Sequence, residues 1–209
     1  MLSFNRISTW EPGFVAAIRR HYTGSRGAPV GKKMAWEIHE DGMLRGWIGL
    51  GEPSFKLAPR RLLGLEDARP APRTVGNFIF RLELPGTTKA SGILRKWHLV
   101  AERDWADEYG WTIQHWETLI DPSKTASVVC GACYRRAGYR HIGSTTGRSC
   151  SRPVGHSHGP RVWRDGTVKE MFYRGPLVRI SPDNSAFATP RVAVATNGVA
   201  PEQKQEVTP

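Results

Sequence analysis

Cysteine is scarce in this sequence of 209 residues, which contains only Cys130, Cys133 and Cys150. An odd number of cysteines cannot form a complete set of disulfides, so a small scaffold held together by disulfides is excluded. Reduced thiols, as in a cytosolic protein, fit this composition best.

Long hydrophobic runs are also missing. No segment approaches the roughly 20 apolar residues that span a bilayer, and the first residues lack the apolar stretch of a signal peptide. We therefore predict a soluble cytoplasmic protein with no membrane partner. Hydrophobic residues still make up 39% of the chain and include eight tryptophans, which is enough for a substantial core.

Acidic residues are outnumbered, since 19 Asp and Glu stand against 30 Lys and Arg, and the formal net charge is +11. Arginines occur throughout the body of the chain and are not confined to one terminal tail. This balance favours a polyanionic partner, most simply nucleic acid. A basic protein can also carry such charge for solubility alone, or bind ribosomes or anionic lipid without specificity.

The length predicts a single domain over residues 1–184, followed by a tail over residues 185–209 that lacks periodicity and is predicted to be disordered. The predicted helices cover residues 12–22, 60–66, 93–108 and 127–137, with Gly110 as the cap that ends the longest of them. Strands are predicted at residues 1–8, 34–39, 43–50, 77–84, 112–120, 139–142 and 168–180, and the rest, including residues 149–166, is predicted to be loop.

The turn between the strand at residues 77–84 and the long helix is rich in small polar residues. Backbone N–H groups and hydroxyls at a helix N-terminus can bind a phosphate, and a lysine adds positive charge. The candidate groups are Thr87, Thr88, Lys89, Ser91 and Gly92. Such residues also serve simply as helix caps, which is the more common role.

Asp121 follows a strand predicted to be buried, and Tyr134 lies on the next predicted helix. The carboxylate could act as a base, bind a metal or cap the Asp-Pro turn. The tyrosine could equally be a half-buried aromatic with its hydroxyl at the rim. The residues alone favour the capping and packing roles.

The pair Cys130 and Cys133 has the spacing of zinc ligands, and Cys150, His156 and His158 could complete a four-ligand site. Only one such pair exists, however, and it falls inside a predicted helix. Structural cysteines without a metal are therefore the favoured interpretation, with zinc as the alternative.

Arginines cluster after the central strand and alternate with Tyr139, His141 and Trp163. Guanidinium groups bind phosphates and aromatic rings stack on bases, so this region is the best candidate for a nucleic-acid surface. A solvated basic loop is the alternative. The predicted DNA contacts are Arg136, Arg140, Arg148, Arg152 and Arg161.

Several motifs resemble those of known proteins. N-F-I-F-R-L-E-L-P, D-W-x-x-x-Y-G-W, W-E-T-L-I-D-P, G-A-C-Y-R-R-A-G-Y, I-G-S-T-T-G-R and K-E-M-F-Y-R-G-P-L are similar to the domain of the DruA protein of Druantia anti-phage systems and its phage and transposon relatives. The earlier R-H-Y-T-G-x-x-x-A-P-x-G and G-x-I-G-L-G-x-P resemble the opening of phage Mom proteins, which modify adenine in DNA.

This resemblance implies a GNAT-like acyltransferase fold, an α/β (α+β) domain with a mixed central sheet and helices on both faces. It implies acyl-coenzyme A, or a related activated donor, bound after the strand at residues 77–84. Carried over by position, it implies catalytic roles for His21, Tyr22, Asp121 and Tyr134, and donor binding by Arg81 and Ser91. His21, Tyr22 and Asp121 are also residue types that could bind iron.

For a Mom-like protein, the implied activity is addition of a carbamoylmethyl-type group to adenine N6, which protects phage DNA from restriction enzymes. Double-stranded DNA is then the expected partner, with the target base flipped out of the helix. Two alternatives remain: a DNA-binding domain without catalysis, and an acyltransferase for a small amine or a protein. The sequence leaves the oligomeric state open, with a dimer as one option.

Overall fold

The computed structural model describes residues 1–21, 28–54, 56–125, 129–151, 162–165 and 167–176. The predicted disordered tail, residues 185–209, lies outside these ranges. No helix within the described ranges is both long and apolar enough to cross a membrane.

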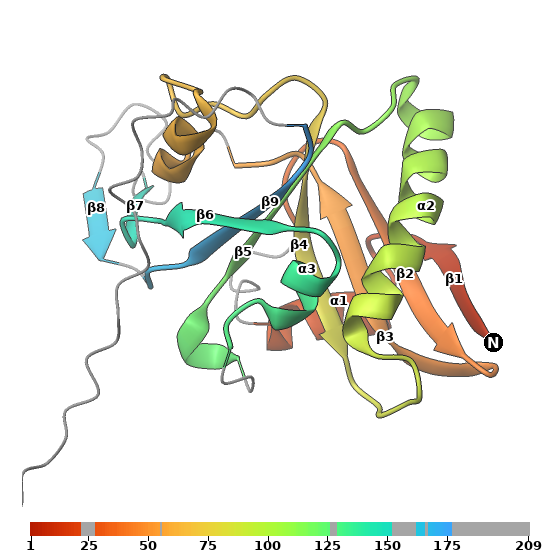
Figure 1. The fold of residues 1–209 in the computed structure, drawn as a ribbon. Helices are drawn as coiled ribbons and strands as arrows, with labels where there is room; N and C mark the ends of the chain where they lie inside the picture. Colours follow the sequence, from red (N-terminus) through yellow and green to blue (C-terminus); the bar gives the residue numbers. More distant parts are fainter. Residues whose placement is uncertain (22–27, 55, 126–128, 152–161, 166, 177–209) are drawn as a thin grey trace, which may run out of the picture.

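A seven-stranded sheet forms the centre of the molecule (Figure 1). All neighbouring strands are antiparallel except β4 and β5, which are parallel. The predicted mixed sheet is therefore confirmed. In spatial order its strands are β1 (Leu2–Ile7), β2 (Lys33–Glu40), β3 (Met43–Gly51), β4 (Thr74–Leu82), β5 (His115–Ile120), β9 (Glu170–Arg174) and β6 (Arg140–Ser144).

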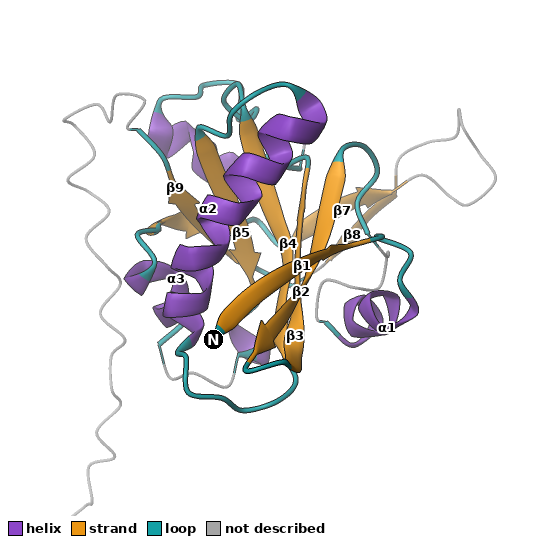
Figure 2. Cartoon of the chain, turned by 90° about the vertical axis from the view of Figure 1, so that its right-hand side faces the viewer, coloured by secondary structure: helices purple, strands orange, loops and turns teal. Residues whose placement is uncertain are grey.

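Helices lie on both faces of this sheet, as predicted. The helices α2 (Ala90–Tyr109) and α3 (Ala132–Arg136) cover one face, and α1 (Pro12–Arg20) covers the other (Figure 2). Short 3-10 helices at Ala58–Leu63 and Pro122–Lys124 complete the described helical segments.

The helix α2 connects the two parallel strands, and its sequence explains its position. Apolar residues repeat at helical spacing, so that Ile93, Leu94, Trp97, Ala101 and Trp105 are all buried. Gly110 ends the helix with a φ of 73°, a left-handed conformation that glycine adopts without strain. A parallel pair needs such a crossover because its strands run in the same direction.

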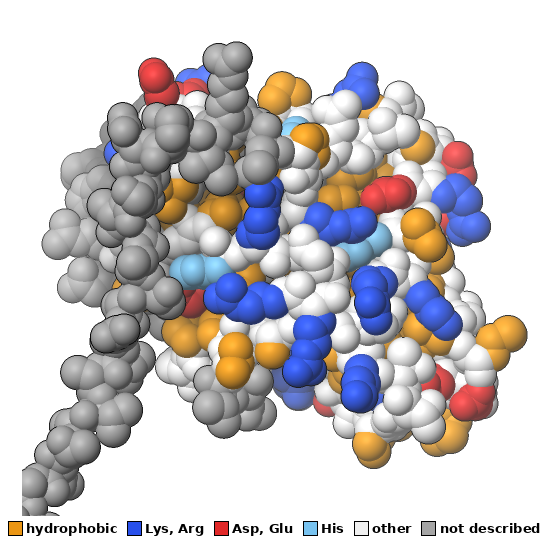
Figure 3. All heavy atoms as spheres, viewed as in Figure 1, with side chains coloured by type: hydrophobic (Ala, Val, Ile, Leu, Met, Phe, Trp, Pro, Cys, Tyr) orange, Lys and Arg blue, Asp and Glu red, His pale blue; other side chains and the backbone are white. Residues whose placement is uncertain are grey.

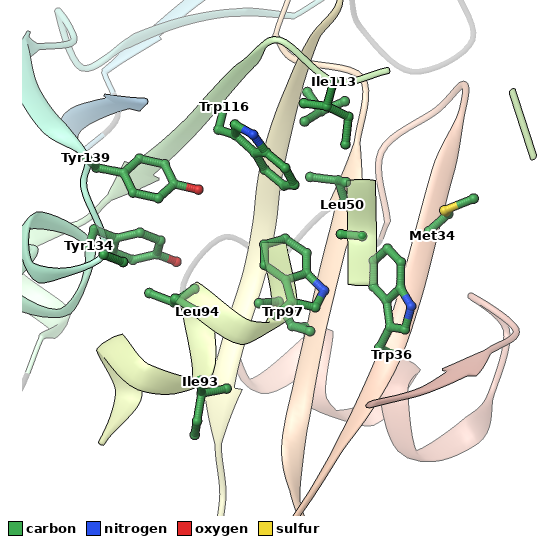
Figure 4. Packing of buried hydrophobic residues seen from close by; sticks show 14 of the residues in the cluster. Met34, Trp36, Leu50, Ile93, Leu94, Trp97, Ile113, Trp116, Tyr134 and Tyr139 are labelled. Carbon is green, nitrogen blue, oxygen red and sulfur yellow. The ribbon is translucent and has the colours of Figure 1, made fainter. Parts of the chain in front are cut away.

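The core under α2 contains the buried tryptophans Trp36, Trp97, Trp105 and Trp116, three of which are labelled in Figure 4. Trp36 on β2 and Trp116 on β5 both pack edge-on against Trp97, with ring centroids 5.6 and 5.4 Å apart. Edge-to-face contact is the favoured geometry for aromatic rings. These contacts attach α2 to both halves of the sheet.

The structure corrects several predicted boundaries; the strand predicted from residue 112, for example, begins at His115. The predicted loop at residues 149–166 contains two strands, β7 (Arg148–Ser151) and β8 (Val162–Asp165), which pair with each other outside the main sheet. The last strand of the sheet stops at Arg174 because Gly175 and Pro176 follow it. The first helix ends at Arg20, two residues early, since His21 is extended. The helix α3 begins only at Ala132, so Cys130 precedes it.

The imidazole of His98 is buried in the core beside Trp97 and Trp116. The Nε2 atom of His98 lies 2.9 Å from the hydroxyl of Tyr139, while its buried Nδ1 has no hydrogen-bond partner among the described residues. Burial, followed by the positive charge of Arg174, lowers the pKa of His98 to about 3. The imidazole is therefore neutral in the folded protein at neutral pH.

This burial predicts acid sensitivity. In the unfolded chain His98 binds a proton below about pH 6.5. The folded protein binds it only near pH 3, so stability is lost as the pH falls between these values. Between pH 7 and pH 4.5 this loss should amount to about 2–3 kcal/mol. Urea unfolding of the wild type and of His98→Gln, followed by tryptophan fluorescence, should show their stabilities converging over this range. A constant difference would contradict the assignment to His98.

Candidate active site

The two parallel strands separate part-way along their length. Their ladder ends at the pair Asn77–Thr118, although β4 continues to Leu82 and β5 to Ile120. Figure 1 shows the two strands diverging beyond this point. On its other side β4 carries a bulge, because Ile79 pairs with Gly49 and Asn77 with Leu50 while Phe78 has no partner. Such a bulge increases the local bend of a strand.

A cleft of about 1070 Å³ occupies the space between the separated strands. Its wall combines the end of α1, β4, the start of α2, β5 and α3. Six of the residues predicted as functional from the sequence line it: His21, Arg81, Lys89, Ser91, Tyr134 and Arg136. Segments distant in sequence are thus brought to one site.

The carboxylate of Glu40 fills the turn that joins β4 to α2. It accepts hydrogen bonds from the backbone N–H groups of Thr87 (3.1 Å) and Thr88 (2.8 Å) and from both threonine hydroxyls. Arg45 Nη1 also donates to it, at 2.8 Å. These bonds, above all that of the Thr88 hydroxyl, lower the pKa of Glu40 to about 2. The anion held by Thr87 and Thr88 is therefore an internal carboxylate.

The next residues of the turn face the cleft instead. Lys89, Ala90 and Ser91 line it, and no described residue accepts a hydrogen bond from the backbone N–H of Ala90 or Ser91. The N–H of Gly92 donates to the carbonyl of Lys89 at 2.8 Å, and Gly92 is not part of the wall. Within the site predicted at residues 87–92, Thr87 and Thr88 therefore bind Glu40, whereas Lys89 and Ser91 line the cleft.

We expect Glu40→Gln to weaken the turn, because the amide loses the ion pair with Arg45 and one of its accepting oxygens. Thermal unfolding should show a melting temperature lower by several degrees at pH 7. The carboxylate contributes its stability above about pH 4.5, and this contribution is lost as the pH falls toward 2. Glu108→Gln, which removes an exposed pair with Arg6, is the matched control and should change little. Equal effects of both substitutions would contradict the role of Glu40.

The positive side chains of the cleft fall into two groups. Arg20 and Arg81 both bind the carboxylate of Glu83, each at 2.7 Å. Their hydrogen bonds, that of Arg81 first, lower the pKa of Glu83 to about 2. Three further cations are exposed and have no ion pair within the described part of the chain: Arg19, Lys89 and Arg136. This second group is available to an anionic ligand.

His21 and Tyr134 lie at the wall with different surroundings. Burial, together with the charges of Arg81 and Lys169, lowers the pKa of His21 to about 4, so the imidazole is neutral at pH 7. The hydroxyl of Tyr134 donates to Asn77 Oδ1 at 3.2 Å, and its ring packs edge-on against Phe80 at 6.2 Å between centroids.

Asp121 is not brought to the cleft. Its side chain is buried and accepts hydrogen bonds from the backbone N–H (3.0 Å) and hydroxyl (2.6 Å) of Ser123. It therefore caps the 3-10 helix at Pro122–Lys124, the alternative that the residues alone favoured.

The other predicted residues lie elsewhere. Arg140 is exposed on β6, where it donates to the carbonyl of Gly175 at 3.3 Å. Arg148 begins β7, and its side chain is outside the description. Tyr22, Arg152 and Arg161 are outside the described residues altogether.

The two described cysteines are free thiols, half-buried, and burial raises the pKa of both. Within the described residues, no group of three His, Cys, Asp or Glu side chains is arranged to hold a metal ion. His156 and His158 of the predicted zinc set lie outside those residues, and so does the side chain of Cys150.

Sequence reasoning missed the residues at the point of strand separation. Asn77 was assigned only to a strand, and Thr118 received no role. Both line the cleft, and the hydroxyl of Thr118 donates to the backbone carbonyl of Asn77 at 3.3 Å. A polar residue at the start of the apolar run N-F-I-F was the available signal.

A second pocket, of about 190 Å³, adjoins the cleft and shares Asn77, Phe78, Thr118 and Leu119 with it. Its wall also contains Glu117, whose buried carboxylate pairs with both Arg60 Nε (2.8 Å) and Nη2 (2.7 Å). Other residues of this wall include Pro29, Glu52, Leu57 and Lys169. The four shared residues therefore separate two spaces.

No family model matches the chain, and no curated protein matches it. Solved structures do match. An acetyltransferase from Bacillus subtilis in complex with CoA superposes with a TM-score of 0.51 at 12% identity, covering 85% of this chain and 100% of that one. This chain has the GNAT fold. The fold predicted from the sequence resemblance is thereby confirmed.

Two further structures with lower scores are acetyltransferases. AAC(6')-Ib in complex with paromomycin and acetyl-CoA gives 0.49 at 12% identity, covering 85% of this chain and 94% of that one. The IAA acetyltransferase of Bacillus cereus gives 0.47 at 14% identity, covering 83% and 99%. None of these comparisons tests the resemblance to Mom or Druantia proteins, which stays a prediction.

Proposed function

We propose that this chain is an acyltransferase that uses an acyl-CoA donor and an amine acceptor. The observation that carries the proposal is the cleft between β4 and β5, which begins at Asn77–Thr118 and is lined at its mouth by Arg19, Lys89 and Arg136. The GNAT fold and the CoA complex of the Bacillus subtilis structure support this choice of donor.

The residues of the cleft fit such a donor. Acyl-CoA combines several phosphate charges with a long neutral arm and supplies an acyl group activated as a thioester. The exposed cations and the open N–H groups of Ala90 and Ser91 provide the partners that phosphates require. Phe78, Phe80 and Leu119 provide an apolar wall closer to the point of separation.

The acceptor would reach the thioester from the smaller pocket, since Asn77 and Thr118 border both spaces. In the transfer the amine nitrogen bonds to the acyl carbon, the carbon–sulfur bond breaks, and the proton lost by the amine is balanced by protonation of the sulfur. Tyr134 lines the cleft, and we assign its hydroxyl to donate that proton when the sulfur leaves. The neutral imidazole of His21, also in the wall, is able to accept one.

Isothermal titration of the full chain with acetyl-CoA tests the donor site. We expect binding, weakened about tenfold or more by the double change Lys89→Ala and Arg136→Ala, because two charge-assisted hydrogen bonds are lost. Arg103→Ala is the matched control, since Arg103 is exposed on α2, pairs with Asp104 and does not line the cleft. Absence of acetyl-CoA binding would overturn the proposal. If Arg103→Ala weakened acetyl-CoA binding as much as the double change, the donor site could not be assigned to this cleft.

DNA is a second candidate acceptor, favoured by the charge distribution. Lys and Arg side chains gather on the face that carries α2 and α3 (Figure 3), and the net charge is +11. A strongly basic surface beside the cleft suits a polyanion. On this view the acceptor amine is adenine N6, as the resemblance to Mom proteins implies.

Nucleoside mass spectrometry of DNA from cells that express the chain tests this acceptor. A new deoxyadenosine adduct is expected with the wild type, and a much smaller amount with Tyr134→Phe. Only unmodified nucleosides, together with transfer to a small amine in vitro, would exclude DNA as the acceptor. Tight, salt-sensitive DNA binding without any acetyl-CoA binding would instead favour the non-catalytic DNA-binding domain.

A further inference from the structure

The side chain of Asn77 is buried at the point where the two parallel strands separate. Only 6% of the residue is exposed, yet it borders both the cleft and the smaller pocket. Its Oδ1 accepts a hydrogen bond from the hydroxyl of Tyr134 at 3.2 Å. Its Nδ2 is buried and has no hydrogen-bond partner among the described residues.

Contacts on both sides hold this side chain in its orientation. The backbone carbonyl of Asn77 accepts from the hydroxyl of Thr118 at 3.3 Å, which fixes the start of the side chain. The Tyr134 ring packs edge-on against Phe80 and Tyr139, with centroids 6.2 and 5.2 Å away, so the hydroxyl that binds Oδ1 is itself fixed. With Oδ1 committed to Tyr134, the two Nδ2 hydrogens are directed away from it.

A buried amide nitrogen without an acceptor destabilises a fold, and native proteins rarely keep one without a reason. An apolar residue at position 77 would fill the same space without this cost. Other buried donors of the described residues also lack a partner, but their side chains do not line the cleft, whereas that of Asn77 does, so its open donor points to an acceptor atom that arrives with a ligand. Since Asn77 borders the cleft, the ligand atom is one that enters between β4 and β5.

We propose that Asn77 Nδ2 donates a hydrogen bond to the carbonyl oxygen of the acyl thioester. This inference rests on the proposed function. The thioester carbonyl is a hydrogen-bond acceptor in the donor substrate, and it must lie near Asn77 if the acceptor amine is to reach it from the smaller pocket. As the amine attacks the acyl carbon, negative charge grows on this oxygen, so the hydrogen bond strengthens during the reaction.

Until the sulfur leaves, Tyr134 has a second role in this arrangement. By donating to Oδ1 it fixes which end of the amide faces the acyl group, and it thereby acts as a positioning residue for Asn77. An amide is suited to this task because one end can be anchored as an acceptor while the other donates. Aspartate would keep the anchored end and lose the donor.

Calorimetric titration with two ligands tests the inference. Acetyl-CoA carries the thioester carbonyl, whereas S-ethyl-CoA is a thioether of similar shape without it. We expect the wild type to bind acetyl-CoA about tenfold more tightly than S-ethyl-CoA, the effect of one hydrogen bond to a buried donor. Asn77→Ala should bind the two ligands with similar affinity while keeping the wild-type affinity for S-ethyl-CoA. Asn77→Asp provides the same comparison with an isosteric side chain if the alanine variant does not fold.

The outcomes separate this inference from the proposed function. If the ratio of the two affinities were the same in the wild type and in either variant, the role of Asn77 would be overturned. The assignment of the donor to the cleft would be unaffected. Failure of both ligands to bind the wild type would overturn both proposals together. A general loss of structure would weaken the binding of acetyl-CoA and of S-ethyl-CoA to the same extent. The ratio of the two affinities therefore reports the contact to the carbonyl alone.

Discussion

The architecture of this protein depends on the loss of pairing between β4 and β5 after Asn77 and Thr118. Up to that pair the strands share a parallel ladder, and beyond it their facing N–H and C=O groups no longer bond each other. Such a gap costs free energy inside a sheet unless something else uses the exposed edges. The bulge at Phe78 bends β4, and α2 and α3 pack on one face of the sheet. Both features favour the separated arrangement of the two strands over a continuous ladder. The cleft is the result.

The charged groups around the cleft are of two kinds: those paired within the protein, and those exposed to solvent. Internal carboxylates neutralise some of the cations and donors: Glu40 fills the Thr87–Thr88 turn with Arg45, and Glu83 joins Arg20 to Arg81. These contacts fix the shape of the wall without any ligand. The cations that remain are exposed at the mouth, where water and salt reach them, so they attract an anion without fixing its orientation. Orientation must come from buried groups. Several buried donors of the described residues have no partner, and among them Asn77 Nδ2 belongs to a side chain that lines the cleft.

Much of the fold follows from the sequence. The strands predicted at residues 34–39 and 43–50 pair as a hairpin, and Asp41 and Gly42 between them have the positive φ values, 53° and 80°, that its tight turn needs. The helix α2 was predicted from apolar spacing and Gly110. The pair β7 and β8 was missed, because neither short strand alternates and each is defined by its partner. Non-local pairing of this kind leaves little local pattern to detect.

The site was predicted less completely, for physical reasons. Four residues to which the motif resemblance gives roles, His21, Arg81, Ser91 and Tyr134, line one cleft, and their roles stay predictions. The resemblance could not show that Thr87 and Thr88 are occupied by Glu40, which is 47 residues away from Thr87 along the chain. Nor could it show that Asp121 bonds Ser123 and leaves the cleft to other residues. An open donor such as Asn77 Nδ2 becomes visible only when all its neighbours have been placed.

The most direct test of the whole account is a crystal structure of the full chain with acetyl-CoA. We predict that the donor lies between β4 and β5, with its phosphates near Lys89 and Ser91 and its thioester carbonyl within hydrogen-bonding distance of Asn77 Nδ2. A donor bound outside this cleft, or a thioester carbonyl turned away from Asn77, would contradict the account.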